Sequence, residues 1–257
     1  MERKGGLTHL FIFLYKTANS VLIYKTNSRH SKAVHCCDYF FLLRTKTQKR
    51  TKMKKWILTP EKYLKDHEIK SLRSFLEEKA IVSLTKKQKK PVRDWAIIDI
   101  ALSAGLRASE ICNLRIKDIH VGKGESSIFV ENGKGKRSRL VLIGEKLKKH
   151  LKEYISWKKR NRETASPESY LFTSERSPRM TLSAIQKRFK HWVGEAGIKT
   201  PYSIHSARHT YGTMLYRNTK DLRMVQKQLG HASCQVTEVY ADVINEDTEK
   251  AVNALYV

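Results

Sequence analysis

Residues 95–114 read WAIIDIALSAGLRASEICNL, a strongly apolar stretch followed by a short polar segment. Apolar side chains occupy every side of the first ten residues, so we expect a helix at the centre of the core. Gly105 predicts the end of that helix, because glycine readily adopts the left-handed conformation of a helix C-cap. Arg107 and Glu110 follow in a second short helix, where residues three apart share one face. The stretch therefore predicts a buried helix that leads directly into an arginine–glutamate pair.

The periodicity outside this stretch is helical, except in one segment near the middle of the chain. Short β-like runs occupy residues 116–120, 127–130 and 139–143, and glycines lie between them. Helical spacing of apolar residues returns afterwards, beginning with Leu147 and Leu151. We therefore predict an α+β fold that is mostly helical and contains a small antiparallel sheet.

The charge balance restricts the kind of partner. The 257 residues include 51 Lys and Arg against 25 Asp and Glu, a formal net charge of +26. Such an excess favours a polyanion, because each neutralised phosphate releases condensed counterions. Charge alone does not separate a DNA enzyme from a basic RNA-binding protein.

Composition also bears on the compartment. No apolar run approaches the roughly 20 residues that span a bilayer. Four cysteines in a chain of this length do not form a disulfide scaffold. We expect a reduced, cytoplasmic protein with no membrane partner.

The first 55 residues differ from the rest of the chain. They carry thirteen Lys and Arg but two acidic residues, and they show no sustained apolar period. We predict a basic, poorly structured extension over 1–55 and a folded domain over 56–257. One hypothesis makes the extension a DNA-binding arm. Another, which we favour, is that translation starts at Met53, so whether residues 1–52 belong to the working protein stays open.

Two further segments near the C-terminus carry reactive side chains. His205 and Arg208 lie three residues apart just after Ser203, where a helix is expected to begin and where a phosphate would be stabilised. Downstream, Gly230 is expected to end an amphipathic helix, His231 follows it, and Tyr240 comes nine residues later. Arginines can bind a phosphate bidentately, histidines can move protons, and a tyrosine can become a phosphoester.

A fourth segment is a basic turn. Residues 131–140 read ENGKGKRSRL and lie between two β-like runs, so a hairpin tip is expected there. In isolation this is a flexible basic loop that would touch a phosphate backbone. Lys134 is the residue of interest, and Lys136 is its rival.

Taken together and in this order, these segments resemble the tyrosine recombinases, or phage integrase family, over about residues 59–245. The resemblance implies the tyrosine recombinase catalytic-domain fold, with a catalytic domain over 56–257. It also implies a set of catalytic residues with Glu110 in support: Arg107, Lys134, His205, Arg208, His231 and the nucleophile Tyr240. The arrangement is similar to Xer-type members and to the short members that act as inversion switches.

The family's chemistry assigns each residue a part. Arg107 and Arg208 would bind the scissile phosphate, and Tyr240 would attack it to leave a 3′-phosphotyrosyl bond. In this scheme Lys134 protonates the leaving 5′ oxygen, His205 assists proton removal from the tyrosine, and His231 hydrogen-bonds the phosphate. No metal and no nucleotide cofactor are implied.

The resemblance also implies partners. These are double-stranded DNA and a synaptic homo- or hetero-tetramer assembled on it from protomers that are monomeric when free. Family members commonly carry a core-binding domain ahead of the catalytic domain, whereas 58 residues precede Thr59 here. A helper protein is therefore a possibility to test.

Two alternatives in other classes stay open from sequence. One is a catalytically weak DNA-binding relic of a mobile element, and the other is a strand-passing enzyme like a type IB topoisomerase. The residues do not give the target site. They also do not distinguish integration from excision, inversion or dimer resolution.

Overall fold

The computed structural model describes residues 12–17, 20–25, 58–131, 138–231, 233, 235–241, 252–253 and 255. The chain divides into two compact units, Met1–Met53 and Lys54–Val257. In the first unit, strands β1 (Ile12–Thr17) and β2 (Ser20–Lys25) pair antiparallel. The prediction of a basic extension over 1–55, separate from a catalytic domain over 56–257, stays a prediction.

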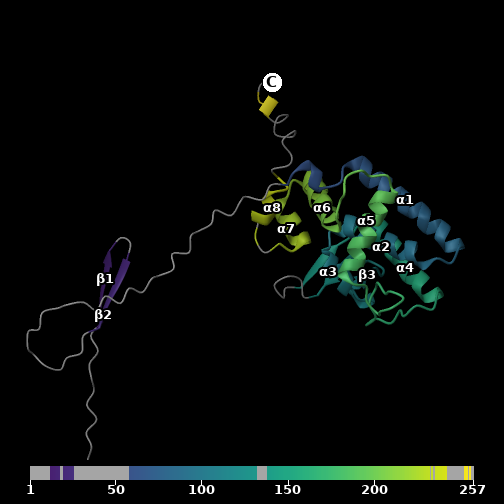
Figure 1. Cartoon of the computed structure of the whole chain (residues 1–257), viewed down its shortest axis with the longest axis horizontal. Helices are drawn as coiled ribbons and strands as arrows, with labels where there is room; N and C mark the ends of the chain where they lie inside the picture. The colour runs from purple at the N-terminus through teal and green to yellow at the C-terminus, as the bar shows by residue number, and fades with distance from the viewer. Residues whose placement is uncertain are drawn as a thin grey trace, which may run out of the picture. The chain divides into compact units, whose positions relative to one another are not determined.

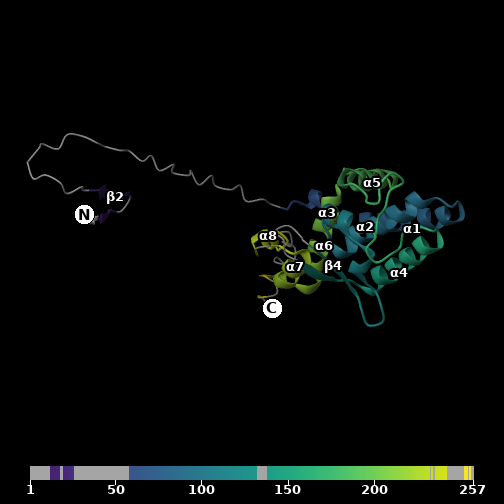
Figure 2. The same ribbon diagram turned by 90° about the horizontal axis from the view of Figure 1, so that it is seen from below.

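The second unit is built around helix α2 (Lys89–Ala104). This helix packs against α1 (Asp66–Thr85), α4 (Glu145–Arg160), α5 (Leu182–Glu195) and α6 (Ile204–Thr219). Figure 2 shows α2 between α5 on one side and α4 on the other. A helix with neighbours on several sides must be apolar around its circumference, so the predicted central helix is confirmed.

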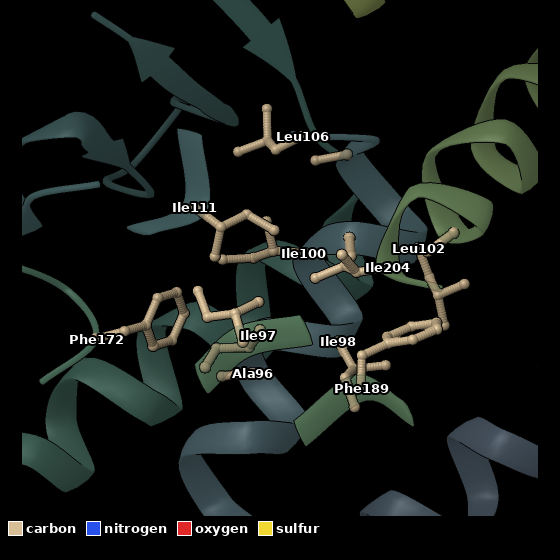
Figure 3. Packing of buried hydrophobic residues seen from close by; sticks show 14 of the residues in the cluster. Ala96, Ile97, Ile98, Ile100, Leu102, Leu106, Ile111, Phe172, Phe189 and Ile204 are labelled. Atoms are coloured by element: carbon tan, nitrogen blue, oxygen red, sulfur yellow. The ribbon is translucent and has the colours of Figure 1, made fainter. Parts of the chain in front are cut away.

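The apolar core around α2 continues beneath the polar segment that follows this helix. Ile97, Ile98 and Ile100 are at most 1% exposed and lie among side chains from α5 and α6 (Figure 3). Leu106 and Ile111, both fully buried, extend this core past the end of the helix. Burying side chains of this size contributes about 1.5–3 kcal/mol each. The backbone on either side of Arg107 is therefore held firmly.

The second unit also contains a three-stranded antiparallel sheet. Its order is β3 (Ile119–His120), β4 (Ser127–Val130) and β5 (Arg139–Leu142), with Val130 opposite Arg139. The predicted strand over 116–120 is wrong for its first three residues. These form a 3₁₀ turn, because the carboxylate of Asp118 accepts a hydrogen bond from the Arg115 backbone N–H and closes the chain locally. The fold class, mostly helical with a small antiparallel sheet, is confirmed.

The C-terminal helices gather at one end of this unit. Figure 1 shows α6, α7 (Leu222–Leu229) and α8 (Gln235–Glu238) together there. Two predicted helix stops are confirmed, since Gly105 ends α2 at φ 62° and Gly230 ends α7 at φ 67°. Within the described ranges, no helix combines the length and apolarity needed to cross a membrane.

Candidate active site

Arg107 and Glu110 meet at the start of helix α3 (Ala108–Asn113). Arg107 is the N-cap residue, and its backbone N–H donates to Glu110 Oε2 at 2.8 Å. Its side-chain Nη1 donates to Glu110 Oε1 at 2.7 Å. A glutamate three residues after an N-cap commonly reaches back in this way. The arginine is thereby fixed at both ends, and its side chain keeps 22% of its surface exposed.

Glu110 receives a second arginine, Arg139, from the first position of β5. Arg139 Nη1 and Nη2 each donate at 2.9 Å, one to each carboxylate oxygen. Burial would raise the pKa of Glu110, but the hydrogen bonds and charges of Arg139 and Arg107 lower it to about 2. The carboxylate is therefore ionised at any physiological pH. Such two-pronged pairs are the strongest ion pairs that side chains make.

Arg208 is buried on α6 and is held by two helix ends. Its Nη1 donates to the carbonyl of Gly105, and its Nη2 donates to the carbonyl of Leu229, both at 2.7 Å. These carbonyls lie where α2 and α7 stop, and helix C-termini carry partial negative charge. Burial and the nearby charge of Arg107 lower the pKa of Arg208 to about 10, so it stays charged.

Two histidines flank this guanidinium. His205 lies one turn ahead of His209 on α6, and their ring centroids are 4.6 Å apart. Partial burial and the charges of Arg208 and Arg107 lower the pKa of His205. Beyond α7, the Nδ1 of His231 lies 3.1 Å from the hydroxyl of Thr237. Burial, followed by the arginine charges, lowers the pKa of His231 to about 3.

Tyr240 is 1% exposed and packs on the backbone of α6. A Cβ at Gly212 would lie 2.6 Å from Tyr240 Cζ, so that position admits only glycine while the ring stays in place. The hydroxyl lies 3.3 Å from His209 Nδ1, and the ring lies parallel to that of His231 with centroids 6.3 Å apart. Burial raises the pKa of Tyr240 to about 12, while Arg208 and Arg107 act in the opposite direction.

The structure brings most of the predicted residues to one place, including the supporting Glu110. Those gathered here are Arg107, Glu110, His205, Arg208, His231 and Tyr240. Lys134 and its rival Lys136 lie outside the described residues. The strands that flank the predicted basic turn, β4 and β5, are present as expected.

Two residues of this site were not singled out by the sequence. Arg139 is one of several basic residues in 131–140, and its partner Glu110 lies 29 positions away in the sequence. His209 directly follows Arg208 and showed no spacing of its own. The alternation of β5 placed Arg139 on a strand, but it could not show which neighbour would receive the side chain.

Comparison with known proteins agrees with this geometry. The sequence pattern of the phage integrase family matches residues 62–246, which is more than two thirds of the chain. The chain belongs to the phage integrase family. Its matched range contains every residue gathered at the site.

Curated relatives of this phage integrase family chain are tyrosine recombinases. It is 32% identical over 246 residues to tyrosine recombinase XerD of Oceanobacillus iheyensis, covering 93% of this chain and 78% of that protein. It is 34% identical over 180 residues to tyrosine recombinase XerA of Pyrococcus furiosus, covering 68% of this chain and 58% of that protein. At this similarity the chain is an enzyme of the tyrosine recombinase class.

Solved structures give the same fold. The crystal structure of XerA recombinase matches with a TM-score of 0.62 and 30% identity, over 77% of this chain and 65% of that one. The XerH site-specific recombinase bound to its difH substrate matches with a TM-score of 0.58 and 23% identity, over 73% of this chain and 52% of that one. The chain thus spans one half to two thirds of the length of these structures.

Proposed function

We propose that this protein cleaves and rejoins double-stranded DNA at specific sites through a covalent bond to Tyr240. The observation that carries the proposal is the convergence of two guanidiniums on one tyrosine. Arg208 and Arg107 lie close enough to Tyr240 for their charges to lower the pKa of its hydroxyl against the effect of burial. A phosphodiester that bridges the two arginines would lie near the tyrosine, whose side chain is buried in the free protein.

The bond changes follow from these positions. Tyr240 Oη attacks the phosphorus, the bond from phosphorus to the 5′ oxygen breaks, and a 3′-phosphotyrosyl ester forms. Arg107 and Arg208 stabilise the added negative charge on the non-bridging oxygens, and such contacts are worth about 10²–10³-fold in rate each. Because the ester bond is conserved, the reverse attack by a 5′ hydroxyl rejoins the strand without a nucleotide cofactor. The chemistry here is supplied by arginines, and we assign no metal.

In this scheme the lysine and histidine side chains transfer protons or donate hydrogen bonds. Lys134 donates to the leaving 5′ oxygen, and Lys136 is its alternative. His205 assists removal of the tyrosine proton, and His231 donates a hydrogen bond to the phosphate. In the free protein the imidazole beside the tyrosine hydroxyl is His209. We propose that His209 holds Tyr240 in this resting arrangement.

Tyr240 has to move before it can react, because a side chain that is 1% exposed cannot reach a phosphate on DNA. A nucleophile released only on the substrate would limit cleavage to assembled complexes. We propose a synaptic homo- or hetero-tetramer on DNA, monomers in its absence, and action on the bacterial nucleoid in the cytoplasm.

The test is covalent trapping. Nicked suicide substrates made from the DNA that flanks the gene are incubated with the protein, and a denaturing gel is examined for a protein–DNA adduct. An adduct with the wild type that is absent with Tyr240→Phe supports the proposal. Phenylalanine preserves the ring packing on Gly212, so loss of the adduct would not reflect misfolding. An adduct that persists in Tyr240→Phe would contradict the nucleophile.

The trapping experiment and a plasmid relaxation assay together separate the alternatives. Salt-sensitive binding of this DNA without any adduct would favour a DNA-binding relic, or a missing helper protein. Relaxation of any supercoiled plasmid, with no dependence on sequence, would favour a type IB topoisomerase. The named relatives favour neither alternative, because they are tyrosine recombinases.

A further inference from the structure

Arg139 makes contacts that no catalytic role explains. Its side chain is 12% exposed and turns inward from the start of β5, toward Glu110. Two of its nitrogens bind the two oxygens of that carboxylate, and a third, Nε, donates to the carbonyl of Gln228 at 3.1 Å. One guanidinium therefore connects a β-strand, the start of α3 and the last turn of α7.

The end of α7 is shaped to receive this side chain. A Cβ on Gly230 would lie 2.7 Å from Arg139 Cδ and 2.9 Å from Nε. Gly230 is also left-handed, so two separate demands fall on the same glycine. The residue after it is His231, so Arg139 packs against the glycine that directly precedes this histidine.

Glu110 lies among several positively charged side chains. Glu110 binds Arg107 directly, and a lone carboxylate would attract that guanidinium away from a phosphate. Arg139 donates to both oxygens of that carboxylate. Arg208 lies 4.0 Å from the same carboxylate. Three guanidiniums around one carboxylate leave an excess of positive charge for an anion.

We propose that Arg139 is a positioning residue, which fixes Glu110 so that Arg107 can bind the scissile phosphate and which sets the place of His231. The inference rests on the proposed function. It adds a residue that acts through others and does not touch the DNA. It also gives the first residue of β5 a part in the chemistry.

The trapping assay compares four variants: Arg139→Met, Arg139→Lys, Glu110→Gln, and Arg139→Met combined with Glu110→Gln. Arg139→Met removes the charge and both hydrogen bonds to Glu110, so the rate of adduct formation should fall about 10²-fold, the effect of a misplacement near 1 Å. Arg139→Lys keeps the charge but not the planar fork, and its rate should fall about tenfold. In Arg139→Met with Glu110→Gln, the rate should be no lower than in the worse single variant, because the two residues act as a unit.

A structural effect is separated from positioning by the substrate. On a methylphosphonate at the cleavage site, which has lost one anionic oxygen, the arginines contribute less. The defect of Arg139→Met should therefore shrink by about tenfold or more if it acts through Arg107. An equal defect on both substrates would mean that Arg139 only stabilises the fold, and this would overturn the proposal. A wild-type rate in folded Arg139→Met would overturn it as well.

A matched control is available elsewhere in the domain. Arg93 on α2 has a side chain that is 13% exposed, lies beside Asp94 and donates to the carbonyl of Thr173. Arg93→Met should lower thermal stability as Arg139→Met does, yet leave adduct formation unchanged at a temperature where both are folded. An equal loss of cleavage in both variants would assign the effect to stability and overturn the proposal.

A measurement without DNA keeps this inference separate from the proposed function. Inorganic phosphate is titrated into the wild type, Arg107→Met and Arg139→Met and followed by ³¹P line width. Arg107→Met identifies binding at this site, and Arg139→Met should bind about tenfold more weakly than the wild type. If no DNA adduct forms with the wild type, the proposed cleavage by the protein alone fails, and this titration still decides on Arg139. Equal phosphate affinity in wild type and Arg139→Met would overturn the role of Arg139.

Discussion

The arginines and the tyrosine are held in opposite ways. The arginine cluster (Arg107, Glu110, Arg139 and Arg208) is fixed by charged hydrogen bonds to a carboxylate and to helix ends. Tyr240 belongs to a separate, small apolar cluster with Leu58, Val225, Leu229 and Val239. The arginine cluster gathers positive charge for an anion, whereas the apolar cluster buries the nucleophile. Charged contacts depend steeply on geometry and resist movement, while a small apolar cluster can open at modest cost.

The largest effect is expected from the best-buried member of the arginine cluster. Arg208→Met should lower adduct formation by about 10³-fold or more, because the phosphate loses a guanidinium. It should also lower the free energy of unfolding by about 2–4 kcal/mol, since the carbonyls of Gly105 and Leu229 lose their partner. Trapping assays and urea denaturation measure the two quantities.

Arg107→Met is the matched comparison for this variant. Its side chain is 22% exposed, and Arg139 would remain on Glu110. Cleavage should fall by a similar factor, but the loss of stability should stay within about 1 kcal/mol. Equal stability losses in the two variants would contradict the conclusion that Arg208 contributes more to the stability of the fold than Arg107.

The tyrosine cluster should respond to volume. Gly212→Ala places a methyl group against Tyr240 Cζ, so we expect a stability loss of about 1–3 kcal/mol. Displacement of the ring should also speed nitration of Tyr240 by tetranitromethane, as measured by mass spectrometry. Gly194→Ala on α5 is the control, since a Cβ there meets nothing within 4 Å. It should be neutral or stabilise by up to about 1 kcal/mol. Unchanged nitration in Gly212→Ala would show that the ring is not confined as described.

A smaller effect is expected where the two regions meet. Thr237→Val removes the hydroxyl beside His231 Nδ1. Cleavage should fall about tenfold at most, because one hydrogen bond contributes about 1 kcal/mol. Thr213→Val is the isosteric control, since its buried hydroxyl has no hydrogen-bond partner among the described residues. A larger loss in Thr213→Val than in Thr237→Val would contradict the orienting role of Thr237.

The smallest effect concerns pH and stability. The pKa values of His209 and His231 are both lowered to about 3, chiefly by burial, against 6.5 ordinarily. Above pH 6.5 both are neutral in either state. As the pH falls from 6.5 toward 3, the two histidines bind protons in the unfolded chain but stay neutral in the folded chain. The free energy of unfolding therefore falls. Between pH 6.5 and 5 we expect a loss of about 1 kcal/mol, reduced by partial exposure. Urea denaturation should show a flatter pH dependence in His231→Asn, and an unchanged slope would argue against the burial of this imidazole.

Much of this arrangement could be predicted from local pattern. The apolar run of 95–104 indicated the central helix, and glycines at 105 and 230 indicated two helix ends that the structure confirms. The first β-like run failed at residues 116–118, because the Arg115 backbone N–H donates to the Asp118 carboxylate and closes a turn that alternation does not reveal. Lys134 stays a prediction, since it lies outside the described residues.

The sequence by itself determined the residues on which the chemistry depends and their order along the chain. Spacing of three residues within a helix or nine across a turn is a local property, so it is readable from sequence. The tertiary structure alone decided that Arg139 meets Glu110, that two helix ends hold Arg208, and that Tyr240 packs on Gly212. These contacts join residues 21 to 103 positions apart or depend on helices crossing closely, and no local pattern specifies which distant group a side chain will find.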